Sequence, residues 1–118
     1  MAVYRGRSTW SLDVMSKVSL RITKLRAGSS TRKPLPFATT EDGDLVIDSQ
    51  LPDDTPLNDH LVWFWSMLKH ERRYLKSLEA EGAILIMRAK GARRPVELKP
   101  NGAEMLHLLG ITLVIGAA

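Results

Sequence analysis

The chain contains no cysteine, which excludes disulfides and thiolate metal sites. It also contains no apolar run of the length that a membrane-spanning helix requires. Residues 1–7 carry positive charges, but no apolar segment follows them, and this pattern argues against a secretory signal. These absences predict a cytoplasmic protein that does not enter a membrane.

The motifs of common catalytic and ligand-binding sites are absent as well. The three histidines form no His-x-x-x-His pair, no serine stands in Gly-x-Ser-x-Gly, and no Gly-Lys-Ser/Thr follows Gly28. A remote hydrolase hypothesis rests on Asp59 and His60, although helix capping explains a carboxylate in a first turn. We therefore predict a non-enzymatic protein with no cofactor and no metal site.

What is present is the composition of an ordinary globular domain, with 44% hydrophobic and 25% charged residues. A chain of 118 residues forms one domain and buries a core without cross-links. The net charge of +4 is unevenly distributed. Residues 1–33 contain eight Lys/Arg and one acid. Residues 34–81 contain four Lys/Arg and ten acids, and residues 82–118 contain five Lys/Arg and two acids. Such blocks can neutralise one another within the fold or across a dimer.

Strand signals occur near both ends of the chain. Residues 14–25 alternate apolar and polar side chains, which is typical of a strand with one buried face. Residues 83–87 are continuously apolar and fit a central strand that is covered on both faces. Shorter strands are predicted at residues 45–47, 96–99 (as a hairpin partner) and 111–115, with a loose segment or edge strand at 1–13 and a long loop at 27–44.

A helical pattern occupies the middle of the chain. It begins at Thr55-Pro56, where threonine suits the N-cap and proline the first helical position, and it ends at Gly82. In one unbroken helix, Glu71 and Arg72 would point into the apolar stripe, where an unpaired charge is costly. We therefore predict a break near Lys69-His70-Glu71 and two helices, over residues 56–69 and 71–81.

A third, shorter helix is predicted after Asn101, because Glu104 follows it at the spacing of a capping box. Gly110 ends this helix, and the last strand follows. Helices in this order can cover only one layer. The sequence thus predicts an α+β two-layer sandwich, whose mainly antiparallel sheet is covered on one face by the helix pair and the short C-terminal helix.

The stretch Trp63-Phe64-Trp65 places three of the chain's seven aromatic residues side by side. In a helix, successive residues are rotated by about 100°, so these three side chains point in different directions. Phe64 and Trp65 then face the core together with Leu68. These three side chains are predicted to fill the space between the helix pair and the sheet.

Trp63 falls on the flank of that buried sector, where Met67 and Tyr74 join it. Either a loop or the N-terminal segment covers these three side chains, or they are exposed for a partner, since aromatic residues and methionine are enriched at interfaces. Arg72 and Arg73 would stand at the rim. The leading hypothesis is a protein-interaction module whose partner is another protein or a second copy of the chain.

Nucleic-acid binding through the basic N-terminal third is the alternative. Basic side chains near aromatic ones can follow a phosphate backbone. The charged outer face of a sheet accounts for the same residues without any ligand. The residues that would carry this function are Arg5, Arg7, Arg21, Lys24, Arg26, Arg32 and Lys33.

Two hydrophobic patterns resemble those of a family of small bacterial proteins catalogued only as a domain of unknown function. The first runs from Leu57-Asn58-Asp59-His60-Leu61 to Gly82, and the second is the closing segment MLHLLGITL, residues 105–113. The resemblance covers residues 45–116. In the family, the strand before the helix pair tends to carry a tryptophan, where this chain has Leu45-Val46-Ile47. The resemblance implies a fold but no activity and no catalytic residues.

Overall fold

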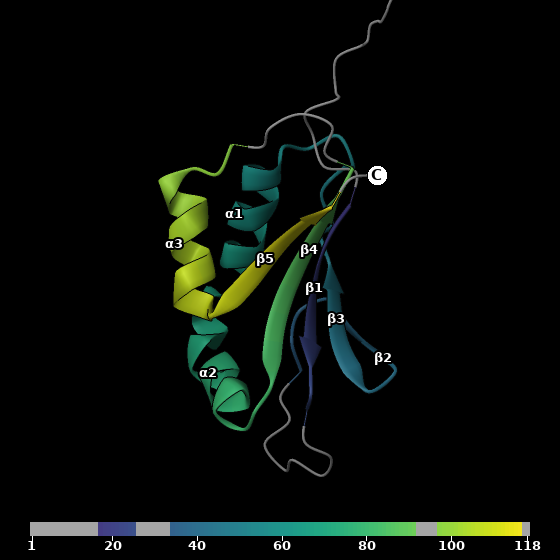
Figure 1. The fold of residues 1–118 in the computed structure, drawn as a ribbon, viewed down its shortest axis with the longest axis vertical. Coiled ribbons are helices and arrows are strands. Elements are labelled where there is room, and N and C mark those ends of the chain that lie inside the picture. The colour runs from purple at the N-terminus through teal and green to yellow at the C-terminus, as the bar shows by residue number, and fades with distance from the viewer. Residues whose placement is uncertain (1–16, 26–33, 92–96, 117–118) are drawn as a thin grey trace, which may run out of the picture.

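The computed structural model describes residues 17–25, 34–91 and 97–116, and its elements form two layers (Figure 1). In chain order the elements are β1 (Lys17–Thr23), β2 (Ala38–Glu41), β3 (Asp44–Asp48), α1 (Leu57–Leu68), the 3-10 helix η2 (Lys69–Glu71), α2 (Arg72–Ala80), β4 (Ile84–Lys90), α3 (Pro100–Leu109) and β5 (Ile111–Gly116). The helices lie on one side of the sheet (Figure 1). The predicted α+β two-layer sandwich is confirmed.

The strands are arranged in the order β2-β3-β1-β4-β5. The pairs β2–β3, β3–β1 and β1–β4 are antiparallel, and β4–β5 is parallel. A parallel neighbour requires a crossover connection, and α3 provides it between β4 and β5. The sheet is therefore mainly antiparallel, as predicted, with one parallel strand at its edge.

The alternation in β1 sets the two faces of the sheet. Val18, Leu20 and Ile22 are buried beneath the helices, and the register places Ile47 of β3 and Met87 of β4 on either side of Leu20. Lys17, Ser19 and Arg21 face the other way, because successive side chains of a strand point to opposite faces. One face of the sheet thus forms the core with the helices.

The helix pair is broken where the sequence predicts. η2 separates α1 from α2 at Lys69–Glu71, and Arg72, the first residue of α2, is exposed. Phe64 and Leu68 are completely buried, whereas Trp65 is only partly buried against the same core. The break therefore keeps the charged turn out of the core, although Trp65 contributes less to the filling than expected.

Three predicted strand features are wrong within the described residues. The supposed loop over residues 27–44 contains β2, because the prolines end at Pro36 and the Asp42-Gly43 turn folds the chain back into a hairpin. Residues 97–99 form no strand and lead directly into α3. The outer face of β4 is open, since Ile84 is 37% exposed. Residues 1–13 and Val96 lie outside the described residues.

The helix caps differ from those predicted. α1 begins one residue later, with Pro56 instead of Thr55 in the N-cap position. The capping box at Asn101 is also wrong, because Lys99 is the N-cap of α3. The side-chain oxygen of Asn58 in α1 accepts a hydrogen bond from the Lys99 backbone N–H at 3.1 Å. In the predicted capping box, a side chain of α3 itself would accept the backbone N–H at the start of this helix. In the structure, Asn58 of the neighbouring helix α1 accepts it.

Candidate functional site

Phe37 is the most exposed large hydrophobic side chain in the part of the chain that the structure describes, with 57% of its surface accessible. It lies in a turn that the Ala38 N–H closes by donating to the Leu35 carbonyl at 3.2 Å. Its φ of 58° is in the left-handed region, which strains a bulky residue and is ordinarily taken by glycine. The fold thus holds an aromatic ring in solvent at a conformational cost.

The Phe37 ring rests on Trp63. Their ring centroids are 5.8 Å apart and the ring planes are inclined by 41°. Trp63 also meets the buried Phe64 edge-on, with the ring centroids 4.9 Å apart. A loop residue therefore covers part of Trp63, which was one of the two alternatives, but the covering residue is itself exposed.

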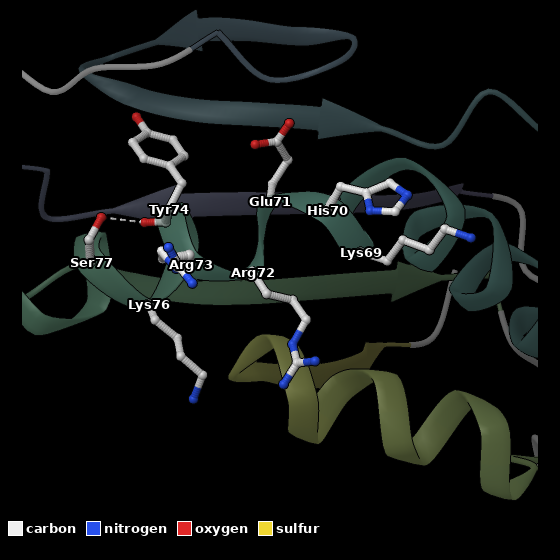
Figure 2. Close-up of a pocket in the computed structure, with 8 residues that line it drawn as sticks. All are labelled: Lys69, His70, Glu71, Arg72, Arg73, Tyr74, Lys76 and Ser77. Carbon is white, nitrogen blue, oxygen red and sulfur yellow. Dashed lines mark hydrogen bonds between the residues drawn. The ribbon is translucent and has the colours of Figure 1, made fainter.

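Met67 follows Trp63 by about one turn of α1, and Tyr74 lies in the first turn of α2. Both are partly buried and pack against the core, as Trp63 does. In Figure 2, Tyr74 extends from α2 toward the same side as Glu71. We call the surface formed by Phe37, Trp63, Met67 and Tyr74 the aromatic flank.

The aromatic flank borders a surface hollow of about 830 Å³ around η2 and the start of α2 (Figure 2). Five basic side chains and one acid, Glu71, line it; the five are Lys69, His70, Arg72, Arg73 and Lys76. Arg72 and Lys76 point away from Tyr74, toward α3 (Figure 2). The structure therefore separates Arg72 from the aromatic residues with which the sequence grouped it.

The nucleic-acid alternative has two of its residues in the described ranges. Arg21 forms ion pairs with Asp44 at 2.7 Å and with Glu41 at 3.0 Å. The hydrogen bond to Asp44, followed by that to Glu41, raises the pKa of Arg21 above its ordinary value. Lys24 is exposed, and the remaining residues, which lie outside the described ranges, are Arg5, Arg7, Arg26, Arg32 and Lys33. Because Arg21 is already paired with two carboxylates, it lends no support to nucleic-acid binding, which stays a prediction.

His60, which the hydrolase hypothesis pairs with Asp59, is buried and forms a hydrogen bond with Ser49. Its Nδ1 lies 2.6 Å from the Ser49 hydroxyl, whose oxygen also accepts the Leu51 N–H at 3.2 Å. Burial lowers the pKa of His60, and the Thr55 backbone and nearby carboxylates only partly oppose this effect. Ser49 and His60 therefore share one hydrogen bond, and the imidazole tautomer determines which of the two groups donates the proton.

Serine and histidine at this distance have the form of a nucleophile and its base. Beside them is a hollow of about 270 Å³ that Lys17 and Asp53 also line. Asp59 is exposed. The Ser49–His60 bond joins the segment after β3 to α1, so it stabilises the connection between the sheet and the helices.

Comparisons of the chain with protein-family models, curated proteins and solved structures give no match. The resemblance to a family of uncharacterised bacterial proteins remains an expectation. Within the described ranges, no helix is both long enough and apolar enough to span a bilayer. No group of three or more His, Asp or Glu side chains suited to a metal ion occurs in those ranges either.

Proposed function

We propose that the protein binds another protein through the aromatic flank. The partner is a segment that carries an apolar side chain next to acidic residues. The apolar side chain contacts Phe37 and Trp63, and the acidic residues face the basic side chains of η2 and α2.

The strained, exposed Phe37 is the observation that carries this proposal. A buried aromatic ring is explained by the hydrophobic effect, but a ring that is mostly in solvent gains little from it. Backbone strain persists where the surroundings impose it, and it is concentrated at sites that bind ligands. Phe37 and Trp63 together present the type of aromatic surface that anchors protein–protein contacts.

The charge around the flank supports an acidic partner. Lys69, His70 and Arg73 are exposed within five consecutive residues of the helix pair, and Glu71 is the one acid among the residues that line the hollow. Two copies of this surface would bring like charges together, which is unfavourable at an interface. The proposal therefore assigns this surface to a different protein and not to a second copy.

A displayed library of random peptides tests the proposal. We expect the enriched peptides to combine an aromatic or aliphatic residue with Asp or Glu. Phe37→Gly should lose binding without unfolding, because glycine adopts positive φ without strain. Val62→Ala is the matched control, since Val62 is an exposed apolar residue of α1 outside the flank.

The charge requirement is tested separately. Arg73→Glu should weaken binding of the enriched peptides by tenfold or more and make binding less dependent on salt. Lys17→Glu introduces the same charge change on the opposite face of the sheet and should leave binding unchanged. Equal binding by wild type, Phe37→Gly and Arg73→Glu would exclude the aromatic flank as the binding surface.

A further inference from the structure

The two edges of the sheet are protected to different degrees. β2, at one edge, has four residues and ends at Glu41, next to Asp42 and Asp44. Short length and charge are features that discourage pairing with another strand. β5, at the other edge, has six residues, with the sequence ITLVIG, and contains neither a charged residue nor a proline.

β5 exposes an apolar side chain on each of its two faces. Val114 is paired with Arg88 and lies on the open face of the sheet, where it is 40% exposed. Ile115 is paired with the buried Ala89 on the helical face and is 47% exposed. An uncharged strand of high β-propensity at an edge is a template for another strand.

We infer that β5 pairs with β5 of a second copy of this chain, antiparallel, to form one continuous sheet across the dimer. The backbone donors and acceptors of an antiparallel edge complement those of an identical strand. The absence of charge in β5 means that self-pairing brings no like charges together along the strand. A two-fold axis perpendicular to the sheet keeps the helices of both copies on the same face.

The symmetry restricts the register. Residues directly opposite each other in an antiparallel pair lie on the same face of the sheet. In a symmetric β5 pair, the two-fold axis must therefore pass through the position where one residue lies opposite its own counterpart, and not midway between two successive residues. With the axis at Leu113, Val114 lies opposite Thr112. With the axis at Val114, this residue lies opposite its own counterpart. Either register gives Val114 a cross-strand neighbour on the open face.

Size-exclusion chromatography with light scattering, over a dilution series, tests the inference. The wild type should have twice the chain mass of 13.2 kDa. Val114→Lys should be monomeric, because an edge lysine blocks strand pairing. Val62→Lys is the matched control, since Val62 is a valine of nearly equal exposure, 41%, on α1, and this variant should remain dimeric.

Thr112→Lys, on the same exposed face of β5, is a second variant in case Val114→Lys fails to fold, and circular dichroism verifies folding of each. A monomeric wild type, a dimer that survives both β5 substitutions, or dissociation of Val62→Lys as well would each overturn the inference. Val114→Lys should still bind the peptides selected by the aromatic flank. This result separates failure of the dimer from failure of the proposed function.

Discussion

The side-chain oxygen of Asn58 lies so close to Gly102 that a Cβ atom at position 102 would clash with it. Asn58 is buried, and it bonds α1 to α3 by accepting the Lys99 N–H and by donating its amide to Asn101 at 3.0 Å. Glycine at position 102 therefore permits the close approach of the two helices, and Asn58 satisfies the backbone at the start of α3.

Gly102→Ala is expected to lower the free energy of unfolding by about 1–3 kcal/mol, although alanine is the better helix former. Asn58→Ala should also destabilise the protein, because Lys99 N–H loses its acceptor. Since both changes act on one contact, their combination should cost less than the sum. Urea denaturation of the four proteins measures this coupling, and strictly additive values would contradict the contact.

Position 37 offers a test of backbone strain. Phe37→Ala and Phe37→Gly both remove the ring, but only glycine relieves the positive φ. The glycine variant should therefore be more stable than the alanine variant by about 1 kcal/mol. Thermal denaturation of the two variants checks the order, and a more stable alanine variant would show that position 37 does not have this conformation.

The two neighbours in the aromatic stretch should respond differently to truncation. Phe64→Ala is expected to cost about 3–5 kcal/mol, because the ring is completely buried. Trp63→Ala should cost clearly less, because Trp63 is only partly buried. Denaturation followed by circular dichroism, which does not depend on the deleted tryptophan, compares the two. A greater loss for Trp63→Ala would place Trp63 in the core.

His60 should make stability depend on pH. Burial lowers its pKa below the ordinary 6.5, so the unfolded chain binds more protons than the folded one as pH falls below that value. The free energy of unfolding should be highest above about pH 7 and should decline toward pH 5.

His60→Gln should flatten this decline, whatever its effect on stability at neutral pH. His70 and His107, which are exposed, are present in both proteins, so a difference in slope between the two proteins is due to His60. Urea denaturation at several pH values gives the slopes. Parallel slopes for wild type and His60→Gln would mean that His60 takes up its proton equally in both states.

The layered fold was predictable because local patterns encode it. The alternation in residues 17–23 and the charged break at Lys69–Glu71 each carry their own signal, and the structure contains both. The contact between Asn58 and Lys99 joins residues 41 apart, and no local pattern indicates such a pair. For the same reason, a capping box at Asn101 was the natural but wrong interpretation.

The candidate site was less predictable than the fold. Helical spacing brought Trp63, Met67 and Tyr74 to one flank, but the same spacing also sends Arg72 to the other side of α2. Phe37 gave no signal, because a phenylalanine after proline suggests neither a positive φ nor exposure. Its role depends on where the turn before β2 places it, which is a consequence of the tertiary fold.

The difference between the two sheet edges also determines how far assembly can proceed. If both edges accepted strands, each added copy would offer a fresh edge, and the sheet would elongate into a fibre. Here the far edge is β2, which is short and ends among carboxylates. In the dimer that we infer, the outer edge of each copy within the described residues is β2, so we expect this strand pairing to end at two molecules.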